Sequence, residues 1–526
     1  MSNQFIFIRS DGQGEWRNYQ RTLYGPAIDR FWFAGVRPQP TQIVEWFREA
    51  SGHWQALLEL ALSDGRDLRP MGGKWSYTQI LSTEGNVAYQ KGMDAIFRLP
   101  DDNGRRLVLA AGGTTINDLN SWLRKEGLSL RTSGASNGQT IAGAIATGTH
   151  GSVPTIGGIQ DHVLGLQLIG GPGPGHNWWL ERYNGQFLSD DFLQAIGATR
   201  RPNPADFESV LVHLGGMGIV NAVLLDVDPI FTVEVIRRQK RIDEKSISAL
   251  EVGDFRGFAC GIDSSNCDRT PYFLQVILNP FKPWGTPALF EFRFRSEGAP
   301  ASQPVLYDEA TTLFSKLLGK NRIGSVPGLE LVAGLGPLAL IADVIDRHPY
   351  LAAQIVPWMM RKAYPKDSQI GCWADFTPAP VHDGLGTLYT ASIAIARTDL
   401  RKALKIMVPA FQEATGGSFV LTLRFVAKSL GHLAFTRFEN NAVIDMDGLE
   451  NDHSQAAGQR IFHALAASDI HYSHHWGKIG RIGKLKLAQD YGQTTINGWK
   501  TMRQQLLDDR MNKLFYGKAL SDWGLV

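Results

Sequence analysis

The stretch that decides the fold is Gln139 to Ser152, which reads QTIAGAIATGTHGS. Almost all of its side chains are small or carry a hydroxyl group. Such a segment can lie directly against a flat or phosphorylated ligand, because its backbone N–H groups and hydroxyls stay accessible as donors. Close packing of a helix on a sheet through glycine and alanine explains the composition equally well. Taken alone, the segment leaves ligand binding and structural packing as equal alternatives.

Three more glycine-rich groups accompany this stretch: MGGKWS at 71–76, AGGTT at 111–115 and LGGMGIV at 214–220. Glycine at such points allows tight turns and a close approach of backbone to backbone or ligand. Between the groups, strand and helix patterns alternate. RLVLA at 106–110 predicts a buried strand, and a helix is expected after Thr115, with Gly127 as its stop.

Two apolar runs, 163–169 and 178–180, predict a hairpin, so residues 1–230 are predicted to form one α+β unit. From residue 231 the glycine density drops. Longer strands are predicted at 232–236, 272–278, 389–395 and 419–426. A helix with Thr398 as its N-cap is expected to run to residue 412. These elements predict a second α+β unit over residues 231–465.

Composition excludes several classes of protein. The chain has 526 residues, and 53 basic against 51 acidic side chains give a net charge of +2, which removes bulk electrostatics as a reason to expect nucleic-acid binding. Three thiols, Cys260, Cys267 and Cys372, exclude a disulfide-stapled scaffold and a metal site of paired CxxC motifs. Residues 1–30 show no secretory signal, and the longest apolar run, 331–342, is too short to span a bilayer. We therefore expect a soluble, cytoplasmic, multidomain protein.

Familiar catalytic motifs are absent or out of context. Residues 134–138 match GxSxG, but no buried strand precedes them and no nucleophile elbow is expected. His471, His474 and His475 have a spacing that would suit a metal on a helix, yet no carboxylate or cysteine lies at a matching distance, so no metal is predicted. The sequence contains no GxxxxGK[ST] phosphate loop and no GxGxxG after a strand.

The glycine-rich blocks together resemble the FAD-binding domain of the vanillyl-alcohol oxidase and p-cresol methylhydroxylase superfamily. Residues 131–152 resemble its central signature, residues 69–76 its RPxGGxHS loop and residues 109–119 its GAGxxxxDL block. Residues 158–166 resemble its xxxDxVxGxxxV strand, and residues 214–229 its GxxGIV block with the following proline. HWGK at 475–478 matches the branch of alditol, aldonolactone and FAD-linked sterol oxidases.

The resemblance implies an α+β fold. A two-subdomain FAD-binding domain would occupy residues 1–230, a cap with a large antiparallel sheet residues 231–465, and residues 466–526 would complete the FAD-binding domain and active site. By position, the resemblance implies that the following residues bind FAD: Met71, Gly72, Gly73, Lys74, Trp75, Ser76, Gly113, Ser133, Gly134, Gln139, Thr140, Gly143, Ala144, Thr147, Gly148, His150, Gly151, Ser152, Gly218, Ile219 and Lys478.

The chain departs from the resembled pattern at two positions. Trp75 replaces the histidine that forms a covalent flavin bond in many relatives, and no cysteine lies near the second attachment position, so we predict non-covalent FAD. The resembled pattern has a Glu-x-Arg pair that faces the substrate. In this chain Thr422 replaces the glutamate, and the arginine is kept as Arg424. Arg424 would stabilise negative charge on substrate or reduced flavin. Lys478 would lie near the flavin pyrimidine, and His475 or His474 would accept the hydroxyl proton.

The resemblance implies an oxidase that takes a hydride from a CH–OH group to flavin N5 and returns electrons to O2 as hydrogen peroxide. A dehydrogenase using a quinone or protein acceptor is a second hypothesis, and a flavin-binding natural-product cyclase or scaffold a third. With the glutamate missing, the apolar cap residues favour a larger, less polar alcohol over a sugar; these residues are Trp284, Phe290, Trp358, Met359, Met360, Trp373 and Phe376.

Overall fold

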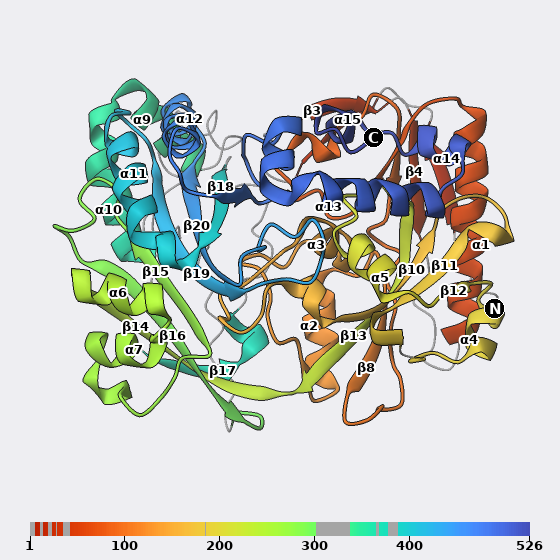
Figure 1. The fold of residues 1–526 in the computed structure, drawn as a ribbon, viewed down its shortest axis with the longest axis horizontal. Helices are drawn as coiled ribbons and strands as arrows, with labels where there is room; N and C mark the ends of the chain where they lie inside the picture. The colour runs from red at the N-terminus through yellow and green to blue at the C-terminus, as the bar shows by residue number, and fades with distance from the viewer. Residues whose placement is uncertain are drawn as a thin grey trace, which may run out of the picture.

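The structure is a computed structural model that describes residues 6–10, 14–18, 24–27, 29–34, 43–184, 186–300, 337–363, 368–376 and 388–526. Its elements gather in two lobes that lie side by side, one built around β8, β10, β11 and β13 and the other around β14–β20 (Figure 1). The prediction of an α+β fold with a large antiparallel sheet is confirmed.

Two sheets form the first lobe. The four-stranded sheet has the order β1-β4-β6-β5, and its β4–β6 and β5–β6 pairs are parallel. The seven-stranded sheet has the order β12-β11-β10-β13-β8-β7, with β9 paired to β13. The strands are β1 (Ile6–Ser10), β4 (Asp29–Ala34), β5 (Leu68–Met71), β6 (Asn86–Tyr89), β7 (Ile96–Arg98), β8 (Arg106–Ala111), β9 (Leu128–Ser129), β10 (Val163–Ile169), β11 (Asn177–Glu181), β12 (Thr199–Arg201) and β13 (Ile219–Pro229). A separate hairpin pairs β2 (Gly14–Arg17) with β3 (Tyr24–Ala27).

Five helices accompany these sheets: α1 (Ile43–Ser63), α2 (Ile116–Lys125), α3 (Ile141–Thr147), α4 (Asp190–Ala195) and α5 (Pro204–Leu211). Apolar side chains of these helices join one continuous core with the strands. The predicted helix after Thr115 is confirmed: Thr115 caps α2 by accepting the Asp118 N–H, and Gly127 beyond its end has a left-handed φ of 69°.

The second lobe is one eight-stranded antiparallel sheet with the order β17-β14-β16-β15-β19-β20-β18-β21. Its strands are β14 (Phe231–Lys240), β15 (Phe273–Leu278), β16 (Ala288–Glu297), β17 (Gln369–Cys372), β18 (Leu388–Ala396), β19 (Phe419–Ala427), β20 (Asn440–Leu449) and β21 (Tyr472–His474). Its helices are α6 (Glu244–Val252), α7 (Phe255–Ile262), α9 (Pro337–Arg347), α10 (Ala352–Ala363), α11 (Leu400–Gln412) and α12 (Asp452–Ala466).

The chain end returns to the first lobe. Figure 1 shows α13 (Lys484–Leu506) crossing that lobe, followed by α14 (Asp509–Leu514) and α15 (Lys518–Asp522). Trp499, Met511 and Leu520 on these helices are fully buried in the same core as α1 and β13. The predicted domain limits near residues 230 and 465 stay predictions.

Two expectations are wrong. Thr398 does not cap α11, because residues Arg397–Asp399 form a 3-10 turn and the helix begins at Leu400, whose N–H donates to the Arg397 carbonyl.

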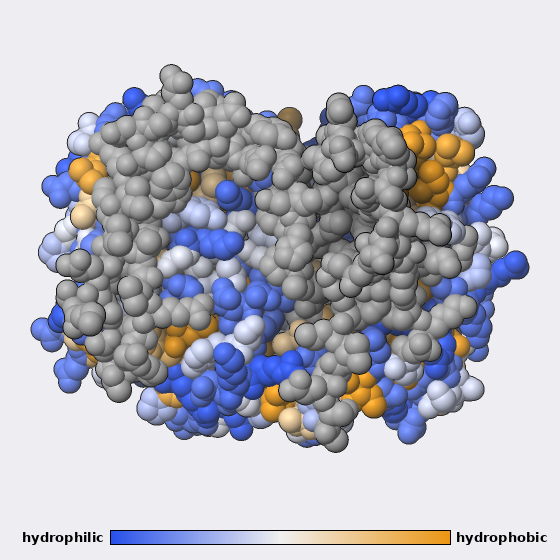
Figure 2. All heavy atoms as spheres, turned by 180° about the vertical axis from the view of Figure 1, so that it is seen from behind, coloured by the Kyte–Doolittle hydropathy of each residue, from blue (hydrophilic) through white to orange (hydrophobic). Residues whose placement is uncertain are grey.

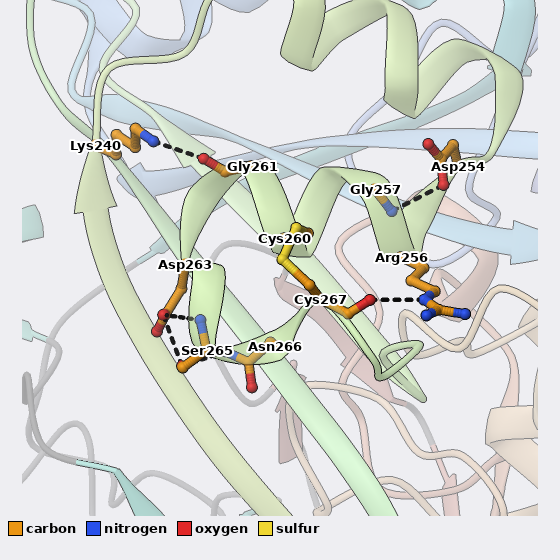
Figure 3. The surroundings of a disulfide bond; sticks show 10 residues. All are labelled: Lys240, Asp254, Arg256, Gly257, Cys260, Gly261, Asp263, Ser265, Asn266 and Cys267. Carbon is orange, nitrogen blue, oxygen red and sulfur yellow. Dashed lines mark hydrogen bonds between the residues drawn. A yellow bond between two sulfur atoms is a disulfide. The ribbon is translucent and has the colours of Figure 1, made fainter.

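Cys260 and Cys267 are not free thiols, since they form a disulfide that ties the end of α7 to the following turn (Figure 3). Arg256 also holds this turn by donating to the Cys267 carbonyl oxygen at 2.7 Å. Cys372 is a buried free thiol.

No helix in the described part of the chain has the length and apolar character needed to cross a membrane. On the face seen in Figure 2, hydrophilic and hydrophobic side chains are interspersed wherever described residues are visible.

Candidate functional site

A cavity of about 570 Å³ lies where the first lobe meets the eight-stranded sheet. One wall comes from three segments of the first lobe: residues 69–77 at the end of β5, residues 134–150 with α3, and residues 213–215. The opposite wall consists of side chains from β15, β18, β19, β20 and α10. The segment after β21, with His475, Gly477 and Lys478, completes the wall. Segments far apart in sequence therefore line one cavity.

Two glycines pack the loop after β5 against the segment before α3. A Cβ on Gly72 would lie 2.1 Å from Thr140 Oγ1, and a Cβ on Gly73 would lie 2.3 Å from the Gly138 carbonyl oxygen. No side chain fits at either position, so backbone from both segments faces the cavity. This cradle suits a ligand that is bound by N–H groups and hydroxyls.

Trp75 lies across the same cradle. A Cβ on Gly138 would lie 2.2 Å from Cζ2 of the Trp75 indole, which lines the cavity. An indole ring offers a flat apolar surface and no nucleophilic atom comparable to an imidazole nitrogen. The site at position 75 therefore fits a cofactor that packs against the protein without a bond to this residue.

The glycine-rich stretch at residues 139–152 forms α3 and its flanks. Thr140 caps α3 by accepting the Gly143 N–H, and Gly148 ends the helix with a left-handed φ of 72°. The amide oxygen of Gln139, which also lines the cavity, is buried without a hydrogen-bond partner among the described residues. The packing alternative for this stretch is confirmed, because its apolar side chains lie in the core. Its polar flanks line the cavity, and ligand binding by them stays a prediction.

The cavity contains many of the predicted cofactor-binding residues: Gly72, Gly73, Lys74, Trp75, Ser76, Gly134, Gln139, Thr140, Gly143, Thr147, His150 and Lys478. The others do not line it: Met71, Gly113, Ser133, Ala144, Gly148, Gly151, Ser152, Gly218 and Ile219.

Packing explains these exceptions. Met71 and Ala144 are core residues, and a Cβ on Gly113 would meet the Gln90 carbonyl oxygen at 2.0 Å. Ser152 joins the lobes by donating to the Leu274 carbonyl and accepting the Phe425 N–H. A Cβ on Gly218 would meet the Ile169 carbonyl oxygen at 2.6 Å, so this glycine serves sheet packing.

In place of Gly218 and Ile219, the preceding residues His213, Leu214 and Gly215 reach the cavity. Buried Arg69 holds them by donating to the carbonyl oxygens of Leu214 and Gly215. Burial lowers the pKa of Arg69 to about 10, which still leaves it charged at neutral pH. This arginine belongs to the resembled RPxGGxHS block, but its role required the structure.

Four charged side chains gather at one end of the cavity and are here called the charged cluster: Arg424, Asp445, Asp447 and Lys478. Arg424 Nε lies 2.7 Å from Asp445 Oδ2, and Lys478 Nζ lies 2.8 Å from Asp445 Oδ1. Asp447 Oδ1 lies 3.7 Å from Lys478 Nζ, and its side chain is 38% exposed. Asp447 also accepts a hydrogen bond from the Thr390 hydroxyl.

Opposite charges control ionisation in this cluster. Burial alone would raise the pKa of Asp445, but Lys478 and Arg424 outweigh it and hold the pKa well below its usual range. Burial alone would lower the pKa of Lys478, but Asp445 and Asp447 outweigh it and raise the pKa. Asp445 and Lys478 are therefore both charged at neutral pH.

Two histidines border the cluster with opposite hydrogen-bonding roles. His150 Nδ1 lies 2.9 Å from the Gly151 carbonyl oxygen, so this nitrogen donates and the neutral ring keeps a lone pair on Nε2. His475 Nδ1 accepts the Gly477 N–H at 2.9 Å, so its proton is assigned to Nε2. The ring centroids lie 5.6 Å apart. In this tautomer Nε2 of His475 donates a hydrogen bond, and the role of His475 as acceptor of a substrate proton stays a prediction.

Burial keeps both rings neutral. It lowers the pKa of His150 to about 4, with Asp445 opposing this shift and Arg424 adding to it. The pKa of His475 is also well below its ordinary value because of burial and the nearby His150. A neutral imidazole ring has one N–H that donates a hydrogen bond and one nitrogen that can accept a proton.

His474 was the other predicted catalytic histidine, and the structure places it outside the cavity. It belongs to β21, where successive side chains point to opposite faces, so its ring packs against Phe462 and Tyr472. The helical spacing considered for His471, His474 and His475 does not exist, because β21 is a strand. Among the described residues, no three His, Cys, Asp or Glu side chains form a metal-binding group.

Part of the cavity lining is apolar and consists of Ile277, Val356, Met359, Met360, Leu388, Phe419, Val420 and Leu449. This apolar lining adjoins the charged cluster, because Val420 lies opposite Asp447 in the sheet. Of the cap residues expected to shape a substrate site, only Met359 and Met360 line the cavity. Phe290 and Trp373 are buried in the core, and Trp284 and Trp358 are 45% and 38% exposed. The apolar character was predicted, but most of the residues that provide it were not.

Comparisons with known proteins agree with this geometry. A family model described as an FAD binding domain matches residues 49–174. L-gulonolactone oxidase of Mus musculus is 25% identical over 217 residues, 41% of this chain and 41% of that protein. L-gulono-1,4-lactone dehydrogenase of Mycobacterium tuberculosis is 27% identical over 177 residues, 33% of this chain and 35% of that protein. The matched part thus spans about two fifths or less of these relatives.

Cholesterol oxidase from Brevibacterium sterolicum has the same fold, with a TM-score of 0.66, 13% identity and coverage of 99% of this chain and 97% of that one. Residues 49–174 thus match an FAD binding domain, and the chain as a whole has the fold of that cholesterol oxidase. Its sequence is related to those of the aldonolactone oxidases, and its cofactor is FAD.

Proposed function

We propose that the protein is an FAD-dependent oxidase that converts a CH–OH group of a largely apolar small-molecule alcohol to a carbonyl, with O2 as electron acceptor and hydrogen peroxide as product. The observation that carries this proposal is the cavity whose lining combines the glycine cradle, the charged cluster and apolar side chains. Binding, charge stabilisation and substrate recognition are thereby available in one space.

The first-lobe wall would hold FAD. Backbone at Gly72 and Gly73, the hydroxyls of Ser76 and Thr140, and the segment 213–215 supply the polar lining of the cradle. When bound, FAD supplies a two-electron acceptor for the substrate hydride at N5. Because Trp75 occupies the position of the linking histidine in the resembled pattern, we propose that the cofactor is held without a covalent bond.

The charged cluster and the two histidines would organise the reacting end. Arg424 and Lys478 are fixed cations that favour negative charge developing nearby. His475 would donate a hydrogen bond through Nε2, and His150 would accept the proton of the substrate hydroxyl on Nε2. Burial of Arg424, Asp445 and both histidines strengthens their interactions because little water screens them.

The apolar lining of the cavity favours a substrate with a large hydrocarbon part. Methionine and aliphatic side chains from α10, β18 and β19 form its lining, and they offer few hydrogen bonds to a polyol. A substrate of this kind would bury its apolar body there and present one hydroxyl to the charged cluster.

A visible absorption spectrum of the purified protein, before and after acid precipitation, is the first test. We expect a flavin band that moves into the supernatant, followed by bleaching of the band when apolar alcohols are added without oxygen. Hydrogen peroxide should form when oxygen is readmitted. Flavin retained in the pellet contradicts non-covalent binding, and a band that no alcohol bleaches contradicts the proposed reaction.

A flavin dehydrogenase is the second candidate, because one of the relatives is named a dehydrogenase. Its signature is rapid flavin reduction by substrate, slow reoxidation by O2 and fast reoxidation by a quinone or protein acceptor. Stopped-flow reoxidation separates the two candidates. A cytoplasmic location stays a proposal from the sequence, testable by cell fractionation.

A further inference from the structure

One carboxylate joins both cations of the charged cluster. Asp445 on β20 is 1% exposed, and its two oxygens contact different partners: Oδ2 contacts Arg424 on β19, and Oδ1 contacts Lys478 beyond β21. Arg424 and Lys478 belong to segments far apart in the chain, and their common contact is this carboxylate.

The strand register explains why the acid stands at residue 445. In the antiparallel pair of β19 and β20, Thr422 lies directly opposite Asp445. Side chains at such opposite positions share a face, with Cβ atoms about 5 Å apart. Arg424 lies two residues along β19 and so points to that same face. A carboxylate can therefore reach this point from either strand, and in this chain, where residue 422 is a neutral threonine, β20 provides it.

The positive charges of Arg424 and Lys478 require a carboxylate nearby. Arg424 is nine-tenths buried and Lys478 is 22% exposed, so without Asp445 two cations would share a poorly solvated space. Asp447 is no substitute, because it is more exposed and lies 3.7 Å from Lys478. With both carboxylates present, the charges of the four side chains sum to zero.

We infer that Asp445 is a positioning residue that holds Arg424 and Lys478 side by side at the cavity and limits the net positive charge presented to bound flavin. This inference rests on the proposed function, since it concerns the reacting end of that site. It also explains how the chain functions with threonine at 422: the acidic group lies on the neighbouring strand.

The test compares Asp445→Asn with wild type in the FAD-loaded protein. The probe is sulfite, an anion that bleaches the flavin band when it binds, so the readout needs no substrate. Loss of one negative charge should tighten sulfite binding by about tenfold or more. The substitution should also lower the pKa of Lys478, because Asp445 raises it in the wild type. As the pH rises, Lys478 should then lose its charge earlier, and sulfite affinity should decline at a lower pH than in wild type.

Glu291→Gln is the matched control. Glu291 is a fully buried carboxylate in the same sheet, held between Arg237 at 2.7 Å and Arg293 at 2.9 Å, and it does not line the cavity. This variant should lose stability yet keep wild-type sulfite affinity. A similar gain in both variants contradicts a specific role of Asp445, as does an unchanged affinity in Asp445→Asn.

The double variant Thr422→Glu with Asp445→Asn returns the carboxylate from the opposite strand. We expect it to restore sulfite affinity to within about threefold of wild type, even where the single variant does not fold. A double variant that fails to fold or to restore affinity overturns the inference. Wild-type protein that binds FAD and sulfite but oxidises no alcohol contradicts the proposed function instead, while the sulfite comparison still decides the role of Asp445.

Discussion

His150 and His475 are nearly the same distance from Phe435, yet each has a different backbone partner. A carbonyl oxygen faces Nδ1 of His150, whereas an N–H faces Nδ1 of His475. Since a carbonyl only accepts and an N–H only donates, these contacts set which ring nitrogen carries the proton. The chemical roles of the two rings are thus fixed by main-chain atoms, which residue type alone does not indicate.

The low pKa of His150 predicts the acid limb of the pH profile. The proton-accepting form is the neutral ring, which exists above a pKa of about 4. We therefore expect kcat/KM to stay level as the pH falls through 6 and to drop only near pH 4. An ordinary histidine would give a limb at about 6.5. Measurement of kcat/KM from pH 3.5 to 8 checks this, and a limb near 6.5 contradicts it.

Substitutions separate the histidines. His150→Asn should reduce kcat by about a hundredfold or more, because general bases typically contribute that much. His474→Asn is the matched control, because His474 is a buried histidine on β21 whose ring packs outside the cavity. This variant should keep wild-type kinetics. Equal losses in both variants would show that the effect is structural.

At the scale of elements, the sequence predicts what local patterns determine. Strands β8, β10 and β19 and helix α2 follow from apolar runs, a threonine cap and a glycine stop. Asp445 was missed because its partners come from β19 and from the segment after β21, so only sheet register brings them together. Its one local signal is a charged residue inside the apolar strand sequence AVIDM.

The cradle of the first lobe makes a prediction about glycine. Gly73→Ala would place a methyl group 2.3 Å from the Gly138 carbonyl oxygen and 3.0 Å from Trp75 Cδ1, so the two cavity-lining segments must separate. Overpacking of this kind costs about 1–3 kcal/mol, which corresponds to a loss of FAD affinity of about 5-fold to 150-fold. Flavin fluorescence during titration of apoprotein with FAD measures that loss.

Gly52→Ala is the control of the same chemistry. Gly52 lies inside α1 on an exposed face, and nothing lies within 4 Å of an added Cβ. Alanine there should raise the free energy of unfolding by about 0.5–1 kcal/mol and leave FAD affinity unchanged. Wild-type FAD affinity in Gly73→Ala would contradict the cradle as the cofactor site.

For the whole molecule, the chain end supports a wall of the cavity formed much earlier in the sequence. The indole N–H of Trp499 on α13 donates to the Val212 carbonyl oxygen at 3.2 Å, next to the segment 213–215 that lines the cavity. Arg503 on the same helix donates to the Gly216 carbonyl oxygen at 2.8 Å. Packing of α13 and the shape of the cofactor site are therefore coupled.

This coupling predicts that Trp499→Ala weakens both stability and cofactor binding. Removal of a fully buried tryptophan costs about 3–5 kcal/mol, and loss of its hydrogen bond frees the backbone before residue 213. We expect a lower Tm, an FAD affinity reduced about tenfold, and partial recovery of Tm with excess FAD, because a ligand stabilises the state that binds it. Leu485→Ala, on the same helix but 82% exposed, should change neither property. If Trp499→Ala lowered Tm while FAD affinity stayed at the wild-type value, α13 would stabilise the lobe without shaping the site.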